Sequence, residues 1–321
     1  MIESSTTSKP IAATRTTLIQ SGSINRWLRK VPLHLLLIIL LIIMLTPFIW
    51  MIGMSLKPDA EATPNALDGV NRDLGTLTGF FWPKGGIQFQ NYADAWTGNF
   101  ASSVIKHDFF DAPFTGYYVN SLVSAFGTVF GVLITSTLAA FAFARMDFFG
   151  KNILFVFLLA TLTIPSEATY LPNLVIVSNL GLTNNLLALI VPWTASVFSI
   201  FLLRQFFMSI PLELYEAGQL DGLSELGYLW KIALPLSSAA VLTSALFSFM
   251  GSWNSVLWPL IASPGTPTVQ LGLKIFISNG DTQTQWNLLM AGSTIAILPI
   301  VVLYFFVQRR FIEGIARSGI K

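Results

Sequence analysis

Long apolar runs without any acidic or basic side chain alternate along the chain with short polar segments. The first run, residues 31–56, holds no Asp, Glu, Lys or Arg over 26 residues. As an α-helix it would be about 39 Å long, and the hydrocarbon core of a bilayer is about 30 Å thick. The run is too long, and begins too far from the N-terminus, for a cleaved signal peptide. It predicts a first transmembrane helix.

Five further apolar segments follow and are counted as spans. The charge-free runs that carry them cover residues 112–144, 152–166, 168–203 and 232–273. The polar turn Ser178–Asn185 separates the third span from the fourth, and the sixth span is expected from about Asn287 to Gln308. Because backbone groups in lipid must be paired within the chain, the spans are expected to be helices. The predicted fold class is an all-α polytopic membrane protein with six transmembrane helices.

The same pattern divides the chain into five parts. These are an N-terminal tail (1–30), a first transmembrane helix (31–56), an extracytoplasmic segment (57–117), a core of five transmembrane helices (118–310) with an internal loop (209–235), and a C-terminal tail (311–321). The N-terminal tail is rich in Ser and Thr and is expected to be disordered. Aromatic residues between Phe80 and Trp96 are expected to form a belt at the membrane surface. Packing into a small cap, or contact with a partner, is the alternative.

Composition and charge agree with a membrane protein and give its orientation. The chain is 53% hydrophobic and 11% charged, against about 25% charged residues in an ordinary soluble domain. With the N-terminus inside, 13 of the 18 lysines and arginines fall on inner segments, so both termini are predicted to be cytoplasmic in a multi-pass plasma or inner membrane protein. The net charge of +2 does not indicate nucleic-acid binding, and the absence of Cys with only two His argues against a metal site.

One polar segment interrupts the apolar pattern at residues 209–236, with the sequence SIPLELYEAGQLDGLSELGYLWKIALPL. By the charge asymmetry it is cytoplasmic. An amphipathic loop that lies on a membrane would need basic residues facing the headgroups. This segment carries four acids and Lys231 as its one base. We therefore expect it to dock on protein.

Local signals predict a helix, a sharp turn and a second helix within this segment. Pro211 and Glu213 suit the first turn of a helix. The pair Asp221–Gly222 predicts the end of that helix, and Ser224 can cap a second short helix that runs to Pro235.

This segment resembles the cytoplasmic loop of the permease subunits of bacterial ABC importers. That loop reads E-A-A, three residues, G, nine residues, I, any residue, L-P. The matching residues are Glu216, Ala217, Gly218, Gly222, Ile232, Leu234 and Pro235. Gly218 replaces the second alanine of the pattern. It is a weaker helix former by about 0.8–1.0 kcal/mol, but the small pair Ala217–Gly218 would let another surface approach the backbone closely.

The resemblance extends over residues 117–321 and, more weakly, the first helix. The stretches YYVNSLVSAFGT, GSWNSVLWPLI and QRRFIEGIARSGIK are similar to the permeases of carbohydrate importers, above all to the shorter permease type, whose best-known member serves maltose. Residues 57–116 and the N-terminal tail are not covered. The resemblance implies an importer permease fold and a coupling helix around Glu216 that seats on an ATPase. The implied coupling residues are Glu213, Glu216, Ala217, Gly218, Asp221 and Gly222.

The resemblance also implies partners, because the chain has no nucleotide site of its own. No G-x-x-x-x-G-K-[ST] motif is present in the sequence. The chain is therefore expected to be no enzyme and to bind no cofactor, with ATP and Mg on two partner ATPase subunits. A second permease, an extracytoplasmic sugar-binding protein and the lipid bilayer complete the expected set. The tail Gly314–Lys321 either reaches between the ATPase subunits or is an ordinary positive tail.

Three residues are candidates for the substrate path. Glu167 is an acid expected toward the outer side of a span, where a cargo contact and an interfacial position are both open. Trp253 and Asn254 are expected inside the fifth helix, which should end near Ile261. An indole ring can stack on a sugar and an amide can bond its hydroxyls, whereas packing between helices is the alternative.

The predicted function is an ATP-driven importer permease that forms half of the path for a carbohydrate, expected to be a di- or oligosaccharide. An importer permease for a non-sugar solute is the main alternative. A six-helix secondary transporter would show an inverted repeat and a buried ionisable relay, and the sequence shows neither.

Overall fold

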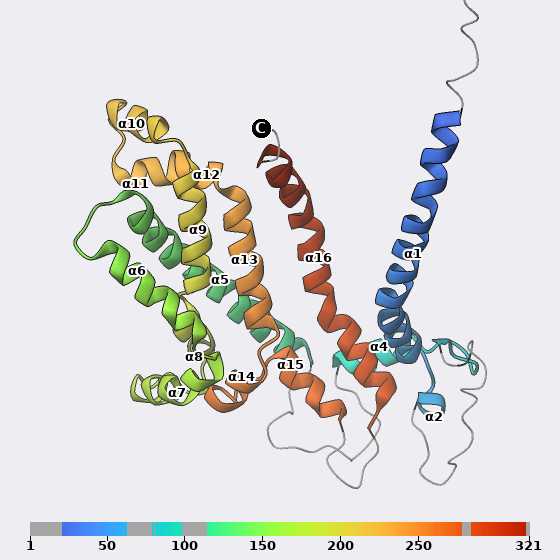
Figure 1. Cartoon of the computed structure of the whole chain (residues 1–321). Helices are drawn as coiled ribbons and strands as arrows, with labels where there is room; N and C mark the ends of the chain where they lie inside the picture. Colours follow the sequence, from blue (N-terminus) through green and yellow to red (C-terminus); the bar gives the residue numbers. More distant parts are fainter. Residues whose placement is uncertain (1–20, 63–78, 80, 98–113, 278–283, 319–321) are drawn as a thin grey trace, which may run out of the picture. The chain divides into compact units, whose positions relative to one another are not determined.

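The computed structural model describes residues 21–62, 79, 81–97, 114–277 and 284–318 (Figure 1). Within these ranges every regular element is a helix and no strand occurs, which confirms the predicted all-α class. Residues 1–20 of the tail predicted to be disordered lie outside the described residues. Residues 21–30 do not fit that prediction, because they form the first turns of a helix. Once a helix is nucleated, each added residue gains a hydrogen bond at little cost.

The chain divides into two compact units, residues 1–50 and 51–321. The first unit holds most of α1 (Ser21–Ser55), whose stretch Lys30–Ser55 is long and apolar enough to cross a membrane. Its large apolar side chains from Leu33 to Leu45 are all exposed. Such exposure is expected of a helix whose surroundings are lipid, and it matches the predicted first span.

Two long helices dominate the second unit. They are α5 (Phe114–Arg145) and α16 (Trp286–Ser318). The apolar part of α16 is Trp286–Gln308, as predicted, but the helix continues to Ser318 through most of the predicted C-terminal tail. Both helices are apolar along most of their length, so each is long enough for one span.

The other candidate spans are pairs of shorter helices with a sharp bend between them. The elements are α6 (Lys151–Ala160), η2 (Thr161–Thr163), η3 (Ser166–Thr169), α7 (Tyr170–Asn179), α8 (Leu186–Ile190), η4 (Val191–Trp193), α9 (Val197–Ser209), α11 (Glu225–Tyr228), η5 (Leu229–Ala233), α12 (Leu234–Leu236) and α13 (Ser238–Trp253). The bends measure 102° after η2, 45° after η4 and 83° after α12. Pro165 stands at the first bend in an extended conformation. Because proline cannot donate a helical hydrogen bond, the helix is interrupted there. Counted as single spans, these pairs bring the number to six within the described residues.

The predicted fifth helix is shorter than expected. It ends at Trp253, where the N–H of Asn254 still bonds to the carbonyl of Met250 at 3.0 Å. Short helices α14 (Leu257–Ala262), α15 (Val269–Gly272) and η6 (Leu273–Phe276) follow. The sequence GSWNS therefore ends a helix instead of lying inside one.

Three clusters of buried side chains hold the second unit together. One surrounds Trp253 and Phe249, and a second lies near Phe207 and Tyr228 beside the polar segment. The third is centred on Trp258. Edge-to-face ring pairs occur in all three, and the Trp253 and Phe249 rings of the first are stacked. Aromatic quadrupoles favour both arrangements.

The described residues of the segment predicted to be extracytoplasmic include the short helices α2 (Asp59–Ala62) and α4 (Gln90–Thr97). Two of its aromatic side chains pack on the protein instead of forming a belt. The Trp96 ring lies 5.4 Å from the ring of Tyr118, and the Tyr92 hydroxyl shares a hydrogen bond of 2.7 Å with Ser55 Oγ. These contacts correspond to the cap alternative for Tyr92 and Trp96, whereas Phe89 is exposed.

Candidate functional site

The polar segment folds as the predicted helix, turn and helix. Its first helix is α10 (Leu212–Leu220), and Pro211 precedes this helix as its N-cap instead of occupying the first turn. Glu213, Glu216 and Ala217 are all exposed. Leu220 is 89% exposed, although it is a large apolar side chain. The outward face of α10 thus combines carboxylates with uncovered apolar surface.

A C-terminal cap of the Schellman type ends α10. Gly222 has a φ of 79°, in the left-handed region that favours glycine. Its N–H bonds to the carbonyl of Gln219, and the N–H of Leu223 bonds to the carbonyl of Gly218, both at 3.0 Å. Asp221 is the C-cap residue. The helix stop predicted from Asp221–Gly222 is confirmed.

The second helix begins as predicted. Ser224 Oγ accepts a hydrogen bond of 3.1 Å from the N–H of Gly227, which caps α11. The helical path then continues through η5, a π-helical turn, and α12 to Leu236. The turn and both caps fix the angle between α10 and α11.

Gly218 faces the chain's own second helix. A Cβ at Gly218 would lie 3.1 Å from Tyr228 Cδ2, which is tighter than ordinary van der Waals contact, and 3.6 Å from Ile232 Cδ1. The interpretation that the pair Ala217–Gly218 opens the backbone to another surface therefore holds only for the exposed Ala217. The glycine that replaces the second alanine of the motif leaves room for the Tyr228 ring packed against it.

A polar contact that the sequence did not predict joins α10 to α11. The Tyr215 hydroxyl donates to Glu225 Oε1 at 2.5 Å, and Gln219 Nε2 donates to the same oxygen at 3.3 Å. Burial, followed by the hydrogen bond and charge of Glu225, raises the pKa of Tyr215 to about 12. Tyr215 therefore remains a protonated donor at neutral pH.

Two arginines connect the α10–α11 segment to the helices α5 and α9. Arg145, the last residue of α5, donates from Nη2 to the carbonyls of Phe207 (2.8 Å) and Ile210 (2.5 Å) at the end of α9. Its guanidinium also lies 5.7 Å from the centre of the Tyr215 ring. A cation at the carbonyl end of a helix is favourable. Arg145 thus contacts α9, the residue that leads into α10, and α10 itself.

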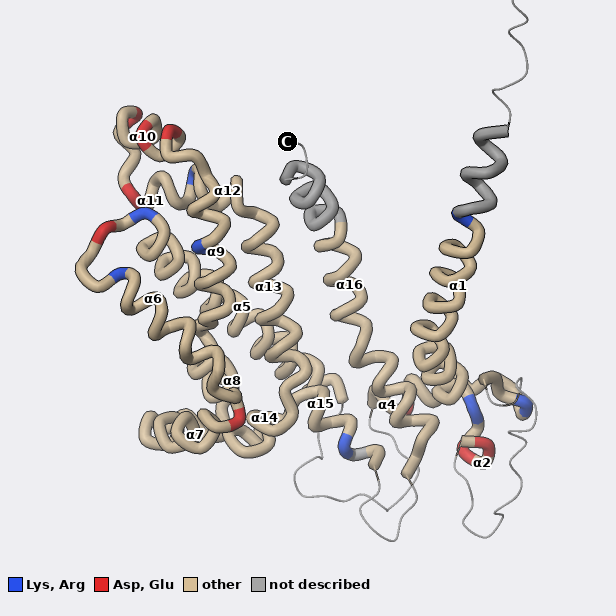
Figure 2. Tube along the Cα trace, in the orientation of Figure 1, with Lys and Arg blue, Asp and Glu red and all other residues tan. Residues whose placement is uncertain are grey.

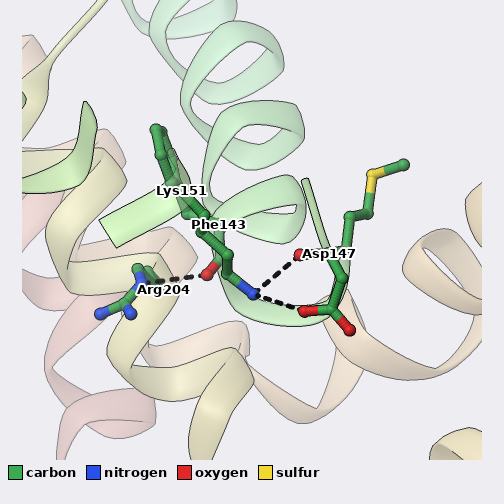
Figure 3. Close-up of polar contacts among 5 residues, drawn as sticks. Phe143, Asp147, Lys151 and Arg204 are labelled. Carbon is green, nitrogen blue, oxygen red and sulfur yellow. Dashed lines mark hydrogen bonds and ion pairs between the residues drawn. The ribbon is translucent and has the colours of Figure 1, made fainter. Parts of the chain in front are cut away.

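Arg204 makes the reciprocal contact from α9 to α5. Its Nε donates to the carbonyl of Phe143 at 3.1 Å (Figure 3). Its guanidinium also lies 4.0 Å from the centre of the Phe155 ring. Nearby, Lys151 pairs with Asp147 at 3.6 Å across the turn between α5 and α6. Because Asp147 is fully exposed, that ion pair contributes little to stability. The arginine contacts, in contrast, join α5 to α9 directly.

Charged side chains are unevenly distributed over the second unit. Figure 2 shows acidic residues on α10 and α11, whereas α5, α9 and α13 are tan, and so carry no charged residue, over most of their length. Glu167 lies exposed in η3, at the 102° bend. Its neighbour Ser166 lines a cavity together with Ser196, at the start of α9, and Ser252, near the end of α13.

The two other predicted path residues have different surroundings. Trp253 is 1% exposed, its Nε1 donates to the carbonyl of Ala296 at 3.0 Å, and its ring stacks on Phe249. This geometry supports the packing alternative for Trp253. Asn254 is exposed and receives a long contact of 3.5 Å from Gln270 Nε2.

A cavity of about 460 Å³ lies beside these candidates. Its wall draws on α5, η3, α7, α8, η4, α9, α13 and α14, and includes Tyr170, Trp193, Ser248, Gly251, Ser252 and Ser255. Neither Glu167, Trp253 nor Asn254 is among the lining residues, although each has close neighbours in the chain that are. The spacing of Ser248 and Ser252 along one apolar helix is a signal that the sequence contained.

Comparison with known proteins gives one family and a consistent set of relatives. Residues 127–317 match the family described as binding-protein-dependent transport system inner membrane component. The sn-glycerol-3-phosphate transport system permease protein UgpE of Salmonella typhi is 36% identical over 209 residues, which cover 64% of this chain and 74% of the relative. The protein of that name from Yersinia enterocolitica serotype O:8 is 35% identical over 211 residues, with the same coverage.

A solved structure shares the fold. It is a bacterial ABC transporter involved in the import of the acidic polysaccharide alginate, and the match covers 92% of this chain and all of that chain. The TM-score is 0.69 at 22% sequence identity.

Proposed function

The chain belongs to the family of binding-protein-dependent transport system inner membrane components, and from this premise we propose that it forms half of the translocation path of an ATP-driven importer. The family assignment confirms the resemblance to importer permeases and the inner-membrane location. Members of this family are transport components and not catalysts. The proposed partners are a second permease, two ATPase subunits that bind ATP and Mg, and an extracytoplasmic binding protein.

We propose that α10 is the surface on which an ATPase subunit docks. The observation that carries this proposal is the contrast between the two faces of α10. Outward, Glu213, Glu216 and Leu220 are exposed. Inward, Tyr215 and Gly218 pack on α11. An apolar and acidic surface on a short, well-anchored helix suits insertion into a cleft of a partner.

The arginine contacts suggest how motion would pass from α10 into the membrane helices. Closure of the ATPase subunits around ATP would displace α10 as a rigid body. Arg145 and Arg204 would carry that displacement to the ends of α5 and α9. Rigid-body displacement of packed helices is a recognised form of switching. Gly222 and Ser224 keep the angle between α10 and α11 constant during the motion.

The proposed cargo is a carbohydrate or a related polyol. The relatives are named for sn-glycerol-3-phosphate, a phosphorylated polyol, which supports a polyhydroxylated solute. Glu167 and Asn254 remain candidates for contact with it. A di- or oligosaccharide remains the expectation from the sequence.

The test of this function is retention of the ATPase subunits by a tagged form of the chain. Glu216→Lys reverses an exposed charge on α10 and should release the ATPase subunits from the purified complex. Asp147→Lys reverses an exposed charge on the neighbouring turn between α5 and α6 and should leave them bound. Equal retention in both variants would contradict docking on α10, and a wild-type chain that retains no ATPase would contradict the importer assignment.

A further inference from the structure

We propose that the cavity of about 460 Å³ is a cargo site built by this chain, and that it accepts an uncharged polyhydroxylated ring, a neutral sugar. This inference rests on the proposed function and narrows its cargo. The volume falls within the range of about 300 to 1,000 Å³ that is usual for small-molecule sites. The wall includes residues beside the bends after η2 and η4 and the break after Trp253. At membrane depth, irregular backbone of this kind is tolerated where it lines a cavity.

Three serines give the cavity hydrogen-bonding capacity. Ser248 and Ser252 are four residues apart, so they lie on one face of α13. Ser255, just beyond the end of that helix, also lines the cavity. Helical hydroxyls commonly bond back to a carbonyl of their own helix, as Thr243 and Thr294 do at 2.7 Å. Within the described part of the chain, the hydroxyls of these three serines make no such bond. They are available to a ligand.

Aromatic rings form another part of the wall. Trp258 is 1% exposed and donates from Nε1 to the carbonyl of Ala188 at 3.0 Å, which fixes its position. The Trp193 ring stands edge-on to Trp258 at 5.6 Å and to Tyr170 at 5.8 Å. Trp193 and Tyr170 are half-buried and line the cavity. Aromatic faces suit the C–H groups of a sugar ring, while the serines suit its hydroxyls.

The lining argues against an anionic cargo. Among the described residues, the cavity wall contains no Asp, Glu, Lys, Arg or His. The first turn of α9 reaches the wall, and its N–H groups are possible donors to an anion. The N–H of Ser199, however, already donates to Ser196 Oγ at 3.2 Å. A phosphate taken from water into such surroundings needs cationic partners. The chain therefore differs in cargo charge from the relatives named for sn-glycerol-3-phosphate.

Gly251 offers a way to close the cavity without straining the helix. It lines the wall, and a Cβ built on it meets no atom within 4 Å. Gly251→Phe should therefore fill the space that the ligand would occupy. Val119→Phe adds a ring to an exposed position of α5 that does not line the cavity, and serves as the matched control. Ser252→Ala removes one hydroxyl and leaves the volume unchanged.

The experiment uses the full complex in proteoliposomes with its binding protein. Uptake is measured for labelled glucose, sucrose, maltose and raffinose, and for sn-glycerol-3-phosphate and glucose 6-phosphate. We expect uptake of at least one neutral sugar and of neither phosphate. For that sugar, Gly251→Phe should lower uptake about tenfold or more, Ser252→Ala should raise the half-saturating concentration about two- to tenfold, and Val119→Phe should change neither.

The outcomes separate this inference from the proposed function. Uptake of either phosphate, unchanged uptake in Gly251→Phe, or uptake of none of the neutral sugars would overturn the neutral-sugar site. In each of these cases the ATPase subunits could still be retained through α10, and the importer assignment would stand. Loss of the ATPase subunits from the wild-type complex would instead contradict the proposed function.

Discussion

The two ends of the α9 and α13 bundle use polar groups in opposite ways. At the α10 end, polar side chains bond within the protein: Tyr215 to Glu225, and Arg145 to the last carbonyls of α9. At the cavity end, Ser248 and Ser252 line an open space without a bond of their own in the described residues. The first region is held by internal hydrogen bonds, although the Tyr228 hydroxyl and Glu225 Oε2 are buried there without a partner, whereas the second region presents unbonded hydroxyls to a cavity.

The difference corresponds to two mechanical requirements of an importer. A contact that transmits motion must not deform, so its polar groups are best bonded to one another and its turns held by caps. A site that binds and releases cargo must exchange partners, so its groups must remain free between cycles. The charge distribution follows the same division, since acids lie on α10 and α11 whereas the cavity wall is uncharged.

The sharpest test of this comparison asks on which side of the membrane each end lies. The predicted topology requires α10 on the cytoplasmic side and Phe89 on the outside. The chain has no cysteine, so one introduced thiol can be labelled without background. Leu220→Cys on α10 should be labelled only from the cytoplasmic side. Phe89→Cys, which is also exposed, should be labelled only from the outside. Labelling of Leu220→Cys in intact cells by an impermeant reagent would contradict the predicted orientation and with it the docking proposal.

A large loss of coupling is expected from Gly222→Val. A β-branched residue is strongly disfavoured at a φ of 79°, and a strained backbone position of this kind costs about 1–3 kcal/mol. The cap at the end of α10 should open and misdirect the helix. Membrane insertion should be normal, while cargo-stimulated ATP hydrolysis should fall about tenfold or more.

Gly150→Val is the matched control for this change. Gly150 also has a positive φ, 77°, and a Cβ on it would meet nothing within 4 Å. It lies in the turn before α6, outside the α10–α11 unit. Equal loss of stimulated hydrolysis in both variants would assign the effect to general strain.

An intermediate effect is expected from Arg145→Met. The change leaves the carbonyls of Phe207 and Ile210 without their cationic donor, and hydrogen bonds to charged groups contribute about 1.5–3 kcal/mol. The ATPase subunits should remain bound, because the outer face of α10 is unchanged. The ratio of cargo-stimulated to basal hydrolysis should fall several-fold, with Arg145→Lys between this variant and wild type. A normal ratio in Arg145→Met would exclude Arg145 from the coupling path.

The smallest effect is expected from Tyr215→Phe, and it depends on pH. Folding raises the pKa of Tyr215 from 10 to about 12. A raised pKa means that the protonated phenol is favoured in the folded state, so this contribution to stability is complete below pH 10 and is lost as the pH rises through 12. Thermal unfolding of the purified complex should therefore show a wild-type advantage that shrinks between these pH values. A difference between the two proteins that does not change with pH would contradict this role.

Local signals explain why the α10–α11 unit could be predicted in detail. A helix stop at Gly222 and an N-cap at Ser224 depend on a few neighbouring residues, so their sequence positions suffice. The contact between Tyr215 and Glu225 depends on the angle between two helices, which only the folded loop provides. Gly218 illustrates the same limit, because the ring that requires it is ten residues away.

The cavity could be predicted only in part, because its wall is assembled by bends. Apolar runs predicted each span but not the 102° and 83° bends within two of them. Glu167, Trp253 and Asn254 were selected as polar or aromatic residues in apolar segments, and the structure places their neighbours on the wall. Trp253 turns toward Ala296 and Phe249 because burial of a large ring with a bonded N–H is favourable.

The most direct test of the account measures two properties of the same proteoliposomes, retention of the ATPase subunits and uptake of a neutral sugar, for Gly222→Val and Gly251→Phe. If the two regions have the separate roles described above, Gly222→Val loses ATPase retention or stimulated hydrolysis, whereas Gly251→Phe keeps the ATPase subunits and loses uptake. If both variants lose the same property to the same extent, or if Gly251→Phe transports as well as wild type, the division between a coupling end and a cargo end is wrong.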